Sequence, residues 1–181
     1  MSLINFVEKS FLNFYQEDIP VSLSLACSAV DATSKMVFPN EKYSNTRFKK
    51  YVKKYFRIIS YYGFPGIIAS SIKIKCTVLK DIKTDENNMV GIEDIIYYTI
   101  RCGLTHKCET DPKLKFINGT KIGEKTGIFT MPKHIVIGLL MSVILCKKNE
   151  KMKLKNDIEL KRNGETININ AMWGKEEEFR K

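Results

Sequence analysis

The chain is organised around the sequence IEDIIYYTIRCGLTHKCE, residues 92–109. It begins as an amphipathic helix, because apolar residues recur at helical spacing and lay an apolar stripe along one face. Glu93 and Asp94 stand in the first turn, where the helix dipole favours negative charge. The pattern therefore predicts a central helix over 92–101.

The end of this helix carries two residues with useful chemistry, Arg101 and His106. An arginine can bind a phosphate, and a histidine with an ordinary pKa of about 6.5 can move a proton. Alternatively, Arg101 extends to solvent and His106 is an ordinary surface residue. On a regular α-helix the two side chains point roughly 140° apart, so they meet only if the helix ends or distorts near Gly103. We therefore predict that His106 lies at or beyond the last turn.

The Arg-x-x-x-x-His pattern on an Ile- and Tyr-rich helix resembles the signature of HEPN-superfamily domains, which are small helical bundles of bacterial toxins, defence systems and RNA-processing nucleases. The resemblance implies that Arg101 and His106 are catalytic residues of a metal-independent endoribonuclease. Cys102 stands at the orienting position, where Asn, Asp or His is usual, and Cys108 replaces a tyrosine that some members carry. The resemblance also implies a homodimer, because the family joins two motifs across a dimer.

Asp31 lies within the most apolar helix of the first half, which is predicted over 21–37. A carboxylate on a buried helix is costly unless it is paired. Two interpretations stay open: Asp31 lies on the polar edge of its helix, or it forms a salt bridge with Arg101 or orients His106.

The charge of the chain is +10, from 30 Lys+Arg against 20 Asp+Glu. This excess favours polyanionic partners such as RNA or nucleotides, although a Lys-, Asn- and Ile-rich composition is also typical of AT-rich genomes. The densest basic stretch is on the helix predicted over 44–62 and comprises Arg47, Lys49, Lys50, Lys53, Lys54 and Arg57. Interleaved tyrosines and lysines can stack on bases and meet phosphates, so we expect nucleic-acid binding here. The alternative is a solvated helix face above a core stripe.

A chain of 181 residues suits a single domain, 1–181. We predict helices over residues 2–17, 21–37, 44–62, 92–101 and 133–146. Alternating residues on both sides of Asn163-Gly164 predict a C-terminal hairpin over 157–169 with a type I′ turn. Residues 67–79 are ambiguous between helix and strand, and 113–129 suit a short hairpin. The expected fold is therefore mainly α, a bundle of about five helices with a small C-terminal β-hairpin.

The five cysteines form no CxxC pair, which is typical of reduced thiols in a cytoplasmic protein. Cys102, His106 and Cys108 offer three metal-ligating atoms, but no second ligand pair is evident, so we expect no metal and no cofactor. There is no secretory signal, and the longest apolar run, 135–146, is too short to cross a bilayer, which needs about 20 residues. We therefore expect no membrane association, and a buried helix in that run.

Three functional hypotheses follow. The first is a HEPN-like endoribonuclease in defence, a toxin–antitoxin system or RNA processing, with His106 as general acid or base and Arg101 on the phosphate. The second is a non-catalytic nucleotide or nucleic-acid binding module of a defence system, which Cys102 favours because a thiol orients a histidine poorly. The third is a structural or interaction protein in which Arg101 forms a core salt bridge.

Overall fold

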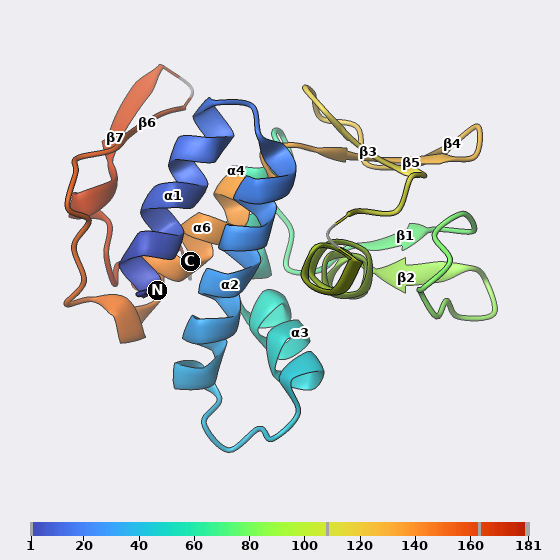
Figure 1. Cartoon of the computed structure of the whole chain (residues 1–181), viewed down its shortest axis with the longest axis horizontal. Helices are drawn as coiled ribbons and strands as arrows, with labels where there is room; N and C mark the ends of the chain where they lie inside the picture. Colours follow the sequence, from blue (N-terminus) through green and yellow to red (C-terminus); the bar gives the residue numbers. More distant parts are fainter. Residues whose placement is uncertain (1, 108, 163, 180–181) are drawn as a thin grey trace.

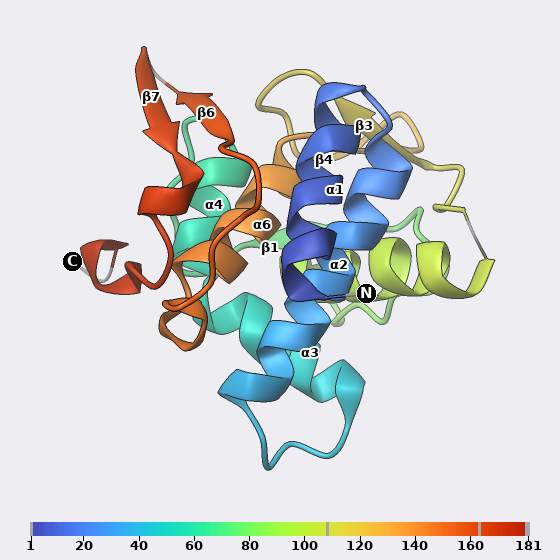
Figure 2. The same cartoon turned by 60° about the vertical axis from the view of Figure 1, so that its left-hand side comes forward.

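The structure is a computed structural model that describes residues 2–107, 109–162 and 164–179. Helices α1 (Leu3–Tyr15) and α2 (Ile19–Val37) lie side by side and antiparallel (Figures 1 and 2). Ser2 caps α1, because its side-chain oxygen accepts the backbone N–H of Asn5 at 3.3 Å. Asp18 caps α2 in the same way.

The centre of the core is α6 (Ile135–Leu145), in which all eleven residues are buried. Helix α2 packs on one side of it and α4 (Phe56–Gly63) on another. Gly63 and Gly138 allow the close approach of α4 and α6, because a Cβ on Gly138 would collide with the backbone carbonyl oxygen of Ile59. The prediction of a buried helix in this run is confirmed.

The predicted central helix begins as one α-turn, α5 (Ile92–Asp94), and continues as a wider π-helix, η1 (Ile95–Lys107), which packs against α2. Gly103 does not end this helix. It is buried, because the chain folds back over it, and a Cβ there would lie 2.7 Å from the carbonyl oxygen of Glu109. His106 lies in the last turn, as predicted.

The helix predicted over 44–62 is divided at Tyr55 into α3 (Ser44–Lys54) and α4. The Tyr55 side chain points into the protein, where its hydroxyl donates to the Glu176 carboxylate at 2.8 Å. Helix α3 packs against α2 and α5, so the basic stretch lies beside the start of the central helix (Figure 1).

The prediction of a mainly α fold is wrong: the described part of the chain contains seven strands in three small sheets, so the fold is α+β. Strand β5 is central to the only three-stranded sheet in that part, where it pairs parallel with β3 and antiparallel with β4. The strands are β1 (Lys73–Lys75), β2 (Met89–Gly91), β3 (Leu114–Ile117), β4 (Gly123–Lys125), β5 (Ile128–Pro132), β6 (Glu159–Arg162) and β7 (Glu165–Asn168). Strands of three to five residues alternate too briefly to give a clear period in the sequence.

The C-terminal hairpin of β6 and β7 falls within the predicted residues 157–169. Gly164 has a φ of +82°, a conformation that glycine adopts without strain. Asn163 lies outside the described residues, so the predicted turn type stays a prediction. After the hairpin, the short 3₁₀ helices η3 (Ile169–Ala171) and η4 (Glu176–Phe179) follow, as does η2 (Lys147–Asn149) after α6.

None of the helices within the described ranges combines the length and apolarity that crossing a membrane requires. Four cysteines carry free thiols: Cys27, Cys76, Cys102 and Cys146. Cys108 lies outside the described residues, so the metal site weighed for it has no structural outcome. In the part of the chain that is described, no three His, Cys, Asp or Glu side chains gather as metal ligands.

Candidate functional site

Arg101 is held by Asp31 across the interface of η1 and α2. Arg101 Nε donates to Asp31 Oδ2 at 3.0 Å, and the two side chains are only 17% and 25% exposed. The guanidinium also lies over the ring of Tyr97, 5.4 Å from its centroid. Burial raises the pKa of Asp31 although Arg101 opposes the shift, and Oδ1 of the carboxylate is buried without a hydrogen-bond partner. Of the open alternatives for Asp31, the structure shows the ion pair.

His106 is exposed and belongs to the same helix as Arg101. In a π-helix, residues five apart are joined by one hydrogen bond and lie on adjoining turns, so Arg101 and His106 are closer in direction than on an α-helix. Even so, no hydrogen bond joins the two side chains among the described residues, and the guanidinium turns toward α2. The Cys102 thiol lies 4.0 Å from Arg101 Nη1, and none of the hydrogen bonds among the described residues joins it to His106.

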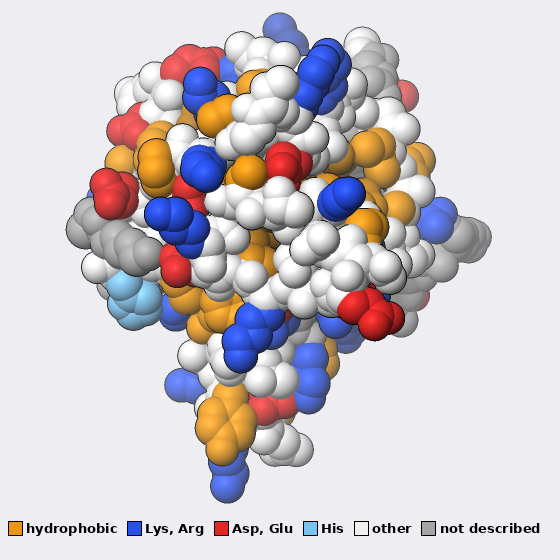
Figure 3. All heavy atoms as spheres, turned by 90° about the vertical axis from the view of Figure 1, so that its right-hand side faces the viewer, with side chains coloured by type: hydrophobic (Ala, Val, Ile, Leu, Met, Phe, Trp, Pro, Cys, Tyr) orange, Lys and Arg blue, Asp and Glu red, His pale blue; other side chains and the backbone are white. Residues whose placement is uncertain are grey.

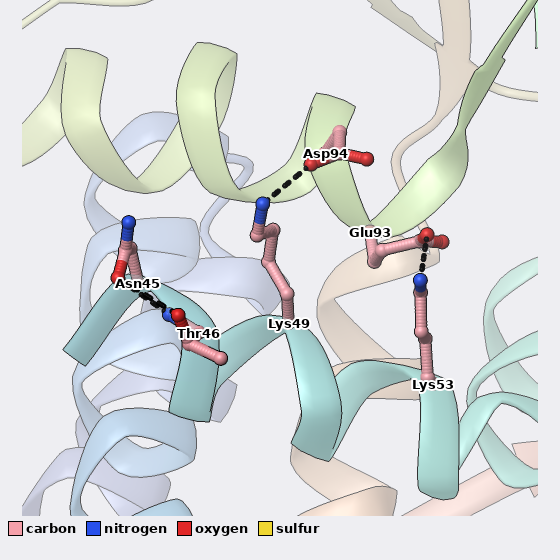
Figure 4. Close-up of polar contacts among 6 residues, drawn as sticks. All are labelled: Asn45, Thr46, Lys49, Lys53, Glu93 and Asp94. Carbon is pink, nitrogen blue, oxygen red and sulfur yellow. Dashed lines mark hydrogen bonds and ion pairs between the residues drawn. The ribbon is translucent and has the colours of Figure 1, made fainter. Parts of the chain in front are cut away.

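Much of the charge on the basic stretch is neutralised by neighbouring carboxylates. Lys49 Nζ lies 2.9 Å from Asp94, and Lys53 Nζ lies 3.0 Å from Glu93, so α3 is tied to the first turn of the central helix (Figure 4). Lys50 forms an ion pair with Glu41, and Arg47 donates a hydrogen bond to the backbone carbonyl of Glu41. The Lys54 ammonium lies over the rings of Phe38 and Tyr55. Arg57 also has an interaction within the protein. The six predicted nucleic-acid-binding residues are therefore largely occupied within the protein.

A larger candidate site lies elsewhere, in a cavity of about 840 Å³ between the C-terminal hairpin and the helices. This volume is within the range of small-molecule sites, about 300–1,000 Å³. We call it the hairpin cavity. Its walls come from the end of α1, the end of α4 with the loop after it, the start of α6, and strand β6. Its aromatic and polar lining includes Phe14, Tyr15, Tyr61, Tyr62, His134 and Arg162.

The hairpin is fastened to the helices on two sides of this cavity. The Tyr15 hydroxyl donates to the backbone carbonyl of Glu159 at 3.0 Å, which joins α1 to β6. Arg162 Nη2 donates to the carbonyl of Tyr61 at 2.5 Å, and its guanidinium carbon lies 3.6 Å from the centroid of the Tyr61 ring. Burial is the main cause that raises the pKa of Tyr62 to about 12, so its phenol is neutral at physiological pH.

His134 lines the cavity just before α6 and meets the Phe14 ring edge-on, with centroids 5.6 Å apart. Its Nδ1 atom is buried without a hydrogen-bond partner. Burial, and then the charge of Lys133, lower the pKa of His134, so the ring is neutral at pH 7. Lys133 itself is paired with Glu17 at 2.6 Å.

Sequence reasoning did not find this cavity, because its walls come from four segments that are far apart in the chain. The sequence contains two features that the structure brings to it. His134 is one of only two histidines, and a hairpin is predicted over 157–169. Neither feature indicates that a cavity is left between the hairpin and the helices.

The fold and cavity together define an α+β protein with a cavity of ligand size between its C-terminal hairpin and its helices. The chain belongs to the Rv1289 family, which matches residues 2–181. It is 23% identical over 165 residues to uncharacterized protein Rv1289 of Mycobacterium tuberculosis, covering 88% of this chain and 77% of the relative. The same identity and coverage hold for uncharacterized protein Mb1320 of Mycobacterium bovis. No solved structure matches the chain. The resemblance to HEPN domains stays a prediction.

Proposed function

We propose that this protein is a non-catalytic module that binds a nucleotide in the hairpin cavity. The observation that carries the proposal is a cavity of about 840 Å³ lined by tyrosine rings together with Arg162 and His134. Bases stack on aromatic side chains and on the plane of an arginine guanidinium, whose N–H groups can also donate hydrogen bonds to acceptor atoms of the ligand. Only one N–H of Arg162 has a partner in the described part of the chain, so others are left for a ligand.

The state of Arg101 supports a binding role over a catalytic one. A nuclease of the predicted kind needs this guanidinium at the phosphate, whereas here it is paired with Asp31 and mostly buried. Pulling Arg101 away would leave a buried carboxylate unpaired, which is strongly unfavourable.

The proposal is tested by calorimetric titration of the purified protein with AMP, GMP, CMP and UMP. We expect saturable 1:1 binding of at least one of them. Ile68 lines the cavity and is 60% exposed, so Ile68→Asp should place a carboxylate at the entrance without harming the fold and should weaken binding of a phosphate-bearing ligand. Leu12→Asp is the matched control, because Leu12 is 55% exposed on α1 and does not line the cavity. No binding of any of the four would refute the proposal, as would equal effects of the two variants.

A second candidate is the HEPN-like endoribonuclease, in which two copies of the chain would each supply Arg101 and His106. The observation that favours it is the exposure of His106 in the last turn of a π-helix, a rare element that is frequent at functional sites. Its test is the cleavage of single-stranded RNA by the wild type and by His106→Ala, with the oligomeric state measured by light scattering. If the wild type is a dimer that cleaves RNA and His106→Ala does not cleave it, the endoribonuclease would replace our first proposal. Either function places the protein in the cytoplasm, where RNA and nucleotides are present.

A further inference from the structure

The buried Nδ1 atom of His134 is an anomaly, because the great majority of buried polar atoms in proteins have a hydrogen-bond partner. A proton on this nitrogen would be a buried donor without an acceptor, and a doubly protonated ring would add a buried charge. The neutral ring is therefore expected to carry its proton on the other nitrogen, Nε2. Because His134 lines the hairpin cavity and its Nδ1 is buried, the Nε2–H is the donor that the ring can offer to a ligand there.

The charges around the imidazole show what kind of group it would meet. Lys133 precedes it, but its ammonium is paired with Glu17. Helix α6 follows, and its first turn has no side-chain cap, so its N-terminal N–H groups add positive potential at His134. The hairpin contributes the cations Lys161 and Arg162 and the carboxylate of Glu159 to the lining of the cavity. Two cations against one carboxylate in the lining, together with the N-terminus of α6 at His134, therefore favour a ligand group that accepts hydrogen bonds and carries negative charge.

We infer that His134 is the specificity-determining residue of the hairpin cavity, and that its Nε2–H donates to a phosphate oxygen of the bound nucleotide while the base lies against the tyrosine and Arg162 wall. This inference rests on the proposed nucleotide binding. It assigns the phosphate to the start of α6 and predicts that a nucleoside, which lacks the phosphate, does not engage His134.

The first test is the tautomer of His134, which is measured in the free protein by a long-range ¹H–¹⁵N correlation spectrum of the imidazoles. The chain has only two histidines, and His106→Gln assigns the pair of signals by removing one. We expect His134 to show the Nε2–H tautomer and its signals to shift on addition of AMP, but not of adenosine. An Nδ1–H tautomer of His134 would overturn the inference. So would His134 signals that do not shift when AMP is added, if calorimetry shows that AMP binds.

The second test compares three side chains at this position. His134→Phe keeps an aromatic edge against Phe14 but has no donor, so the affinity for AMP should fall about tenfold, the effect of one lost charge-assisted hydrogen bond. His134→Gln carries an amide nitrogen near the position of Nε2 and should restore most of the affinity, whereas the shorter His134→Asn should not. Adenosine binding should be nearly equal in all three.

The outcomes separate the two proposals. If wild type binds none of the four nucleotides, the proposed function fails. If wild type binds AMP, but His134→Phe binds it equally well or loses adenosine binding to the same degree, the nucleotide site stands and the role of His134 is wrong. Circular dichroism of each variant shows that it is folded before its affinity is compared.

Discussion

Removing the Arg101 guanidinium tests whether its ion pair holds the fold together. Exposed ion pairs contribute about 0–1 kcal/mol, whereas breaking a buried pair from one side costs about 3–5 kcal/mol. The Arg101 and Asp31 side chains are 17% and 25% exposed, which is nearer the buried limit. We therefore expect Arg101→Met to lower the free energy of unfolding by about 2–3 kcal/mol, measured by urea denaturation.

The same reasoning predicts how this loss depends on pH. Burial already raises the pKa of Asp31 in the folded protein, and removing Arg101 removes the group that opposes this shift. At a pH between the pKa of Asp31 in the unfolded chain and its higher pKa in the folded variant, Asp31 binds a proton only in the folded variant. The stability of the variant therefore falls as pH rises through this range. The deficit of Arg101→Met relative to wild type should therefore be largest near neutral pH and shrink as pH falls toward the ordinary range of an aspartic acid.

A double variant provides the control. Asp31→Leu combined with Arg101→Met replaces the pair by apolar side chains, which is often neutral or stabilising, so most of the lost stability should return. If the unfolding free energy of Arg101→Met lies within about 0.5 kcal/mol of wild type, the pair does not stabilise the fold, because surface substitutions have effects of that size. A loss of stability that does not depend on pH would likewise refute the reasoning.

Three further outcomes are expected. Gly138→Ala should destabilise the protein by about 1–3 kcal/mol, seen as a lower melting temperature, because its Cβ would meet the backbone of α4; an unchanged melting temperature would mean that α4 and α6 can separate. Arg162→Lys keeps the positive charge but should weaken nucleotide binding in calorimetry, because an ammonium lacks the planar guanidinium group that stacks on Tyr61. Equal affinity would show that only the charge matters. Replacing Lys49, Lys50, Lys53 and Lys54 by Glu should destabilise the contact of α3 with α5, because Lys49 and Lys53 pair with Asp94 and Glu93, and should weaken salt-dependent RNA binding. Unchanged RNA affinity in a folded variant would mean that this face is only solvated.

The helices could be predicted because their signals are local. Ser2 and Asp18 cap the helices that follow them, and the apolar run of α6 is long enough to identify a buried helix. The sheets could not be predicted as well, because β3 pairs in parallel with β5 and no local turn specifies that register. The hairpin of β6 and β7 was found because the residues around Gly164 carry a turn signal.

The candidate sites show the same difference between features with a local sequence signal and features that depend on packing. The sequence brought Arg101 and Asp31 into one hypothesis, since a charged residue on each of two apolar helices needs a partner, and the structure shows them paired. It could not show that the lysines of α3 meet the carboxylates of α5, because that contact depends on how the two helices pack. The hairpin cavity depends on packing to a still greater degree, because it is the space left where four elements fail to fill the volume between them.

The walls of the hairpin cavity also set the order in which the site can form during synthesis. Phe14 and Tyr15 leave the ribosome well before Arg162 and the rest of the hairpin. A nascent chain can pair α1 with α2 before any of the later wall exists, but it cannot hold a ligand until the hairpin reaches Tyr15 and Tyr61. Occupancy of the cavity would thus report that α1 and the hairpin have come together, and a bound nucleotide would slow their separation.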